Sequence, residues 1–147
     1  MYNINARIIK NVNGILFVRL AFMGRISKDG KAVLILEKDR DLADSIRMFL
    51  EDMYPVYIID DPSKLRSHIN RYGIKLVVTD LDIATSDFHK NLHSIRSANP
   101  AVKFIMMYMF LDEDDSKNYA ILKEADDFIF KPFDATVFRH KVDRLLA

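Results

Sequence analysis

The chain has 147 residues, a usual length for one domain, and its 22 basic and 21 acidic residues give a formal net charge of +1. Half of the residues are hydrophobic and 29% are charged, a composition that excludes a disordered chain. The balanced charge argues against a nucleic-acid partner, and the absence of cysteine excludes disulfides and thiolate metal sites.

The first 30 residues do not share the pattern of the rest of the chain, and we expect them to form an N-terminal extension. Asn13-Gly14 predicts a hairpin turn, and a short helix is the alternative. The apolar stretch Ile15–Met23 is shorter than the roughly 18 residues of a membrane span, and Arg19 interrupts it. We therefore expect a cytoplasmic protein with no membrane partner, in which this extension packs on the domain or on a second chain of a homodimer.

Residues 31–147 alternate short apolar runs with amphipathic segments. The runs have strand length, and several are continuously apolar, which is typical of parallel strands covered on both faces. The predicted strands are Ala32–Leu36, Val56–Ile59, Leu76–Thr79, Phe104–Met107 and Phe128–Phe130.

Five helical patterns lie between and after these strands. Asp39 and Asp61 are placed as N-caps, Gly73 is placed as a helix stop, and the last helix is expected to open at Asp134. The first helix is expected to carry Leu42, Ile46, Phe49 and Met53 on one face, the fourth to open at Asp112, and the last to carry Phe138, Val142 and Leu145. This alternation predicts an α/β fold with a doubly wound, five-stranded parallel sheet, whose functional residues follow the carboxyl ends of the strands.

Charged and aromatic residues follow these predicted strand ends. The stretches VLILEKDRDL, KLVVTDLD, KFIMMYM and EADDFIFKPFD, in this order, resemble those of a response-regulator receiver domain, over about residues 31–147. The resemblance implies a flavodoxin-like fold and a role in two-component phosphorelay signal transduction. It implies a signalling protein and not an enzyme, with a histidine kinase or a phosphotransfer protein as the phosphoryl donor. Because nothing follows Ala147, we expect a separate output protein as the second partner.

The resemblance also implies roles for individual residues. Asp80 is the expected phosphoacceptor, Lys131 is the lysine that meets the phosphoryl group, and Pro132 follows a cis peptide bond. Glu37, Asp39 and Asp82 are expected to form an acidic pocket. A carboxylate that attacks a phosphoryl group leaves an acyl phosphate, and the anionic phosphoryl needs positive charge, which the family supplies as Mg²⁺ and the lysine.

Three positions depart from the family pattern. Lys38 stands where the family has an acidic metal ligand, so Mg²⁺ binding by Glu37 and Asp80 is expected to be weak or absent. Tyr108 stands at the position of the switch Ser or Thr, and its hydroxyl lies too far out to reach back to a phosphoryl on Asp80. Phe128 stands at the switch aromatic and, without a hydroxyl, is expected to prefer burial.

Two alternative functions remain open at this stage. The first is a phosphate-independent pseudo-receiver, a binding module in which Lys38 takes the place of the metal beside Glu37, Asp80 and Asp82. The second is an enzyme, because Asp80-Leu-Asp82 resembles the DxD motif of haloacid-dehalogenase-like phosphatases, with Asp126-Asp127 as the later acidic motif. That family places its nucleophile after the first strand of its core, whereas Asp80 follows the third predicted strand here.

Overall fold

The five apolar runs form the strands of one sheet in the computed structural model, which describes residues 30–81, 86–109 and 121–147. All strand pairs are parallel, in the order β2-β1-β3-β4-β5. The strands are β1 (Ala32–Leu36), β2 (Val56–Ile59), β3 (Ile74–Asp80), β4 (Lys103–Tyr108) and β5 (Asp127–Phe130). The predicted doubly wound parallel sheet is therefore confirmed.

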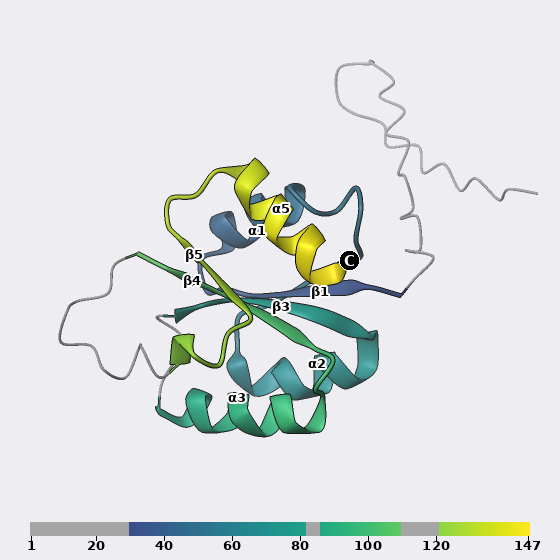
Figure 1. The fold of residues 1–147 in the computed structure, drawn as a ribbon, viewed down its shortest axis with the longest axis vertical. Coiled ribbons are helices and arrows are strands. Elements are labelled where there is room, and N and C mark those ends of the chain that lie inside the picture. The colour runs from purple at the N-terminus through teal and green to yellow at the C-terminus, as the bar shows by residue number, and fades with distance from the viewer. Residues whose placement is uncertain (1–29, 82–85, 110–120) are drawn as a thin grey trace, which may run out of the picture.

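The helices cover both faces of this sheet. They are α1 (Arg40–Met48), the short 3₁₀ helix η1 (Pro62–Lys64), α2 (Leu65–Tyr72), α3 (Ser86–Ala98) and α5 (Ala135–Leu146). Helices α1 and α5 lie on one face, and α2 and α3 lie on the other (Figure 1). Successive strand residues point to opposite faces and thus enter separate cores, so that Val33 and Ile35 pack with Phe138, while Leu34 and Leu36 pack with Phe104.

Local sequence signals set the ends of these helices as predicted. The Asp39 carboxylate accepts a hydrogen bond from the Leu42 N–H at 3.0 Å and caps α1. Asp61 caps η1, and Asp134 caps α5 through two backbone N–H groups. Helix α2 ends at Gly73, whose φ of 64° is a left-handed conformation that glycine adopts without steric cost.

The first helix is shorter than its periodicity predicted. Helix α1 ends at Met48, and a series of turns follows, in which backbone N–H groups up to Tyr54 bond to carbonyls from Ile46 to Leu50. Met53 lies in these turns and is 49% exposed, so it is not part of the buried helix face. Apolar residues keep a helix-like spacing through these turns, which explains why the periodicity predicted a longer helix.

Several expectations fall on residues outside the described ranges. They are the N-terminal extension with its Asn13-Gly14 turn, most of the fourth helix opening at Asp112, and Asp82. Within residues 30–81, 86–109 and 121–147, the helices are all too short or too polar to cross a bilayer.

Candidate functional site

Asp80 and Lys131 meet at the carboxyl end of the sheet. Asp80 is the last residue of β3, is 5% exposed, and lies opposite Met107 of β4. Lys131 directly follows β5, where its N–H donates to the Tyr108 carbonyl at 2.7 Å and its peptide bond with Pro132 is cis. The Lys131 ammonium group donates to Oδ2 of Asp80 and forms an ion pair with it. The fold thus brings together two residues that are 51 positions apart in the chain.

Glu37 adds a second carboxyl group to this site. It follows β1, is 6% exposed, and its Oε1 accepts a hydrogen bond from the Asp39 N–H at 2.9 Å. Its Oε2 is buried without a hydrogen-bond partner among the described residues. Burial raises the pKa of Glu37, and the neighbouring Asp80 carboxyl raises it further, against the lowering effects of the Asp39 N–H and the Lys131 charge. Glu37 and Asp80 thus form a pair of buried carboxyl groups beside one ammonium group.

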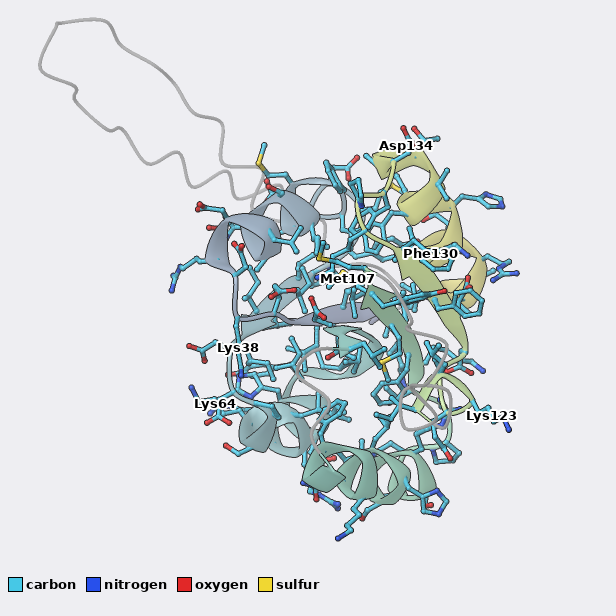
Figure 2. The ribbon with its side chains drawn as sticks, turned by 90° about the vertical axis from the view of Figure 1, so that its left-hand side faces the viewer. Lys38, Lys64, Met107, Lys123, Phe130 and Asp134 are labelled. Carbon is cyan, nitrogen blue, oxygen red and sulfur yellow. The ribbon has the colours of Figure 1, made fainter. Side chains whose placement is uncertain are left out.

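Lys38 does not take the place of a metal ion next to Asp80. Its side chain is exposed and lines a surface cavity beside α1 and β2, whereas the cation on Asp80 is Lys131. In Figure 2, Lys38 lies at one edge of the molecule, Phe130 lies at the opposite edge, and Met107 lies between them. The prediction that Lys38 replaces the metal is wrong, because side chains alternate in the extended segment and Glu37 is the residue that points inward.

Asp39 is not part of the predicted acidic pocket. The Asp39 carboxylate is exposed and directed to the first turn of α1, where it caps the helix and does not face Asp80. Asp82 lies outside the described residues. Of the two predicted pocket residues that the structure describes, Glu37 therefore lies beside Asp80 and Asp39 does not.

These residues do not make a full magnesium site. Mg²⁺ requires an octahedral set of oxygen ligands, and the family provides a second acidic residue at the position that Lys38 occupies. No group of three potential ligand side chains exists among the described residues. The two carboxyls of Glu37 and Asp80 are present, but one oxygen of Asp80 is already bonded to Lys131. Among the residues that the structure describes, the donor set is thus one carboxylate short.

A metal titration tests this conclusion. We expect the protein to show no saturable Mg²⁺ binding below about 1 mM, and Lys38→Asp to bind Mg²⁺ at least about tenfold more tightly, because it replaces the ammonium group next to Glu37 with a negative charge. The measurement is isothermal titration calorimetry, and Lys90→Asp on the exposed surface of α3 is the control for the same change in charge. Tight Mg²⁺ binding by the unmodified protein would contradict the prediction.

The stability of the protein should depend on pH through Glu37. The pKa of Glu37 is raised in the folded state, so the folded protein holds this proton more tightly than the unfolded chain does. Below the ordinary Glu pKa of about 4.3, this contribution to stability is fully present, and it is lost as the pH rises through the raised pKa. Glu37→Gln keeps the acceptor for the Asp39 N–H but carries no charge.

We therefore expect Glu37→Gln to gain stability relative to the unmodified protein as the pH increases from about 4 to about 8. Urea unfolding of both proteins across this range measures the difference in the free energy of unfolding. A difference that stays constant with pH would show that Glu37 is not the titrating group. Asp44→Asn, on the exposed part of α1, is the control carboxylate.

An aromatic cluster occupies the predicted switch region. Tyr108, the last residue of β4, is 4% exposed, and its ring lies 4.1 Å from that of Phe130 and 5.8 Å from that of Phe128, centroid to centroid. Phe128 is 46% exposed, so the prediction that it is buried is wrong. Ile129 is the residue of β5 that points into the core. Its neighbours Phe128 and Phe130 therefore point to the opposite side of the strand. Phe130 was not predicted from the sequence to belong to this cluster. Its i, i+2 spacing from Phe128 places both side chains on the same side of the strand and could have indicated it.

Asp126 and Asp127 do not contribute to this site. They lie at the amino end of β5, while Lys131 follows the carboxyl end. Asp126 accepts hydrogen bonds from Arg96 and from the Phe104 N–H. Burial by itself would raise the pKa of Asp127, but hydrogen bonds and charges, chiefly from Lys141, hold it below its ordinary value. Both aspartates are thus engaged in structural ion pairs, and the phosphatase alternative loses its second acidic motif.

Comparison with known proteins identifies relatives of this chain. The family model for the response regulator receiver domain matches residues 33–143. Regulatory protein VanRB of Enterococcus faecalis is 28% identical over 115 residues, which are 78% of this chain and 51% of VanRB. Sensor histidine kinase TmoS of Ectopseudomonas mendocina is 27% identical over 128 residues, which are 86% of this chain and 13% of TmoS. The chain thus spans about half of the first relative and a small part of the second.

Solved structures share the fold at low identity. The receiver domain of the response regulator TorR superposes with a TM-score of 0.67 at 19% identity, covering 79% of this chain and 96% of the other. The N-terminal receiver domain of a response regulator from Bacteroides fragilis gives 0.68 at 16% identity, covering 80% and 97%. With the family match over residues 33–143, the chain belongs to the response-regulator receiver domains of two-component phosphorelay systems and has their flavodoxin-like fold.

Proposed function

We propose that this protein is a phosphoryl-accepting receiver that uses Asp80 as its acceptor and works in the cytoplasm. It takes the phosphoryl group from a histidine kinase or a phosphotransfer protein and passes the signal on by binding a separate output protein. The observation that carries the proposal is the buried Asp80 carboxylate at the end of the central strand β3, paired with the Lys131 ammonium group. A signalling module, and not an enzyme with turnover, is the function that this arrangement supports.

The chemistry follows from the charges of the site. A carboxylate oxygen of Asp80 attacks the phosphorus, the bond between phosphorus and the donor atom breaks, and an acyl phosphate remains on Asp80. Lys131 already contacts the carboxylate and is placed to neutralise the charge of the incoming phosphoryl oxygens. The raised pKa of Glu37 lowers the negative charge that the phosphoryl group meets. With an incomplete metal site, these two residues provide the electrostatic stabilisation.

Labelling with a small phosphodonor tests the proposal. Incubation with phosphoramidate, followed by intact-mass spectrometry, should add one phosphoryl group to the unmodified protein and none to Asp80→Asn. Asp60→Asn, which changes an exposed aspartate after β2, is the matched control and should be labelled like the unmodified protein. Labelling that persists in Asp80→Asn, or an unmodified protein that accepts no phosphoryl group from phosphoramidate or from histidine kinases, would contradict it.

A phosphate-independent binding module is the second candidate. The observation that favours it is the packing of the buried Tyr108 ring on Phe130, together with a metal site that is incomplete among the described residues. In this candidate the aromatic cluster, and not Lys38, makes the receiver independent of phosphorylation. Partner binding that is unchanged in Asp80→Asn, in a protein that phosphoramidate does not label, would favour it over the first.

A further inference from the structure

A cavity of about 550 Å³ opens beside the phosphoryl site and shares Glu37 with it. It lies along the edge strand β2, between the start of α1 and the start of α2, and Asp80 and Lys131 are not among the residues that line it. Its volume is within the range of about 300–1,000 Å³ that is usual for sites of small ligands.

Cationic and acidic side chains both line this cavity, and two of the cations have no acidic partner among the described residues. Lys38 and Arg40 line it and are exposed, and neither has an ion pair with another described residue. Lys64 also lines it, and its ion pair with Asp60 is long at 3.5 Å, with both side chains more than half exposed. Figure 2 shows Lys38 and Lys64 at the same edge of the molecule. Two positive charges, those of Lys38 and Arg40, are therefore available to an anion, and Lys64 adds a third that Asp60 partly neutralises.

The remaining lining is suited to an organic group. Val56 and Ile58 from β2 line the cavity and are only half-buried, so they present apolar surface. His68 and Asp44 also line it and offer groups that can hydrogen-bond a polar ligand. A site with apolar surface and a few convergent polar groups is typical of sites for small organic molecules.

We infer that this cavity binds a small organic phosphate of the nucleoside monophosphate class. Lys38 and Arg40 hold the phosphate, and the organic part lies over Val56 and Ile58. Arg40 is the first residue of α1, where the positive end of the helix dipole adds to the attraction. Lys38, which stands where the family has an acidic metal ligand, thus belongs to a second anion site next to the phosphoryl site. Because Glu37 borders both the cavity and Asp80, a bound ligand lies next to the carboxyl pair.

Titration of the full chain with AMP, adenosine and inorganic phosphate tests this inference, with binding followed by NMR chemical shifts. We expect AMP to bind with a Kd of about 1 mM or lower, and adenosine and inorganic phosphate each to bind at least about tenfold more weakly. Lys38→Ala and Arg40→Ala should each weaken AMP binding about three- to tenfold, since a charge-assisted hydrogen bond is lost. The matched control, Lys90→Ala on α3, should leave it unchanged.

A further variant separates this cavity from the phosphoryl site. Lys131→Ala should not change AMP binding, whereas it removes the cation from Asp80. A protein that phosphoramidate does not label can therefore still bind AMP, and a protein that does not bind AMP can still be labelled. The two proposals are thus tested independently. Absence of saturable AMP binding, equal binding of inorganic phosphate and AMP, or AMP binding that depends on Lys131 and not on Lys38 would each overturn the inference.

Discussion

Lys131→Ala is expected to slow phosphoryl uptake at Asp80 by about 100-fold or more and to destabilise the folded protein. The ammonium group is the cation on the Asp80 carboxylate, and removal of one such preorganised group typically costs two to three orders of magnitude in rate. The same change leaves two buried carboxyls without their cation, which costs about 3 kcal/mol in the free energy of unfolding. The loss of stability should shrink at acidic pH, where a proton can replace the ammonium group.

The measurements are the rate of phosphoramidate labelling and the free energy of unfolding in urea. Lys141→Ala is the matched control, because it also removes a lysine in an ion pair, that with Asp127 at 2.9 Å, but Arg144 still pairs with that aspartate. We expect Lys141→Ala to be labelled at the rate of the unmodified protein. If Lys131→Ala is labelled equally fast, Lys131 does not meet the phosphoryl group.

Tyr108→Thr is expected to cost about 2–4 kcal/mol of stability and to make partner binding more sensitive to the state of Asp80. The Tyr108 ring is buried and packs on Phe130, so its removal leaves a cavity in the core. Threonine also restores a short hydroxyl at the position where the family has its switch residue. If the protein is instead the phosphate-independent module, the second candidate above, Asp80→Asn should change partner affinity only a few-fold, since partner binding then does not differ between the two states of Asp80.

Urea unfolding measures the first effect, and affinity for a partner isolated from the native cell measures the second. Tyr108→Phe is the control, because it keeps the ring and removes only the hydroxyl. We expect Phe130→Ala and Phe128→Ala each to change partner affinity more than Asp80→Asn does. Partner binding that Asp80→Asn abolishes, with no effect of the aromatic variants, would identify an ordinary phosphorylation switch.

The sheet was predictable because its strands are apolar on both faces. Residues Ala32–Leu36 are buried along their whole length, so nothing in the run interrupts the pattern, and the predicted bounds match β1. The starts of α1 and α5 could be predicted equally well, because Asp39 and Asp134 accept hydrogen bonds from backbone N–H groups only two or three residues further on. Signals that act over so short a range do not depend on the rest of the fold.

The directions of side chains after a strand were harder to predict. The resemblance placed Lys38 at a metal-ligand position, but burial of Glu37 requires its neighbour in the extended segment to point outward. Phe128 was predicted from its residue type, although its exposure depends on Ile129, which takes the inward position on β5. Alternation was visible in the sequence at both places. The ion pair between Asp80 and Lys131, by contrast, rested on the family resemblance, because nothing local to either residue points to the other.

Asp126 and Asp127, at the start of β5, stabilise this edge strand against a shift in its register with β4. Asp126 bonds to Arg96 of α3, and Asp127 bonds to Lys141 and Arg144 of α5, so each residue is tied to the helical layer on a different side of the sheet. A displacement of the strand by one residue would exchange its two sides, break both sets of ion pairs and turn the half-exposed side chains of Phe128 and Phe130 toward the core that Ile129 occupies. The alignment of β5 is thus secured by charges at the end far from Asp80, and changes at the phosphoryl site leave that alignment intact.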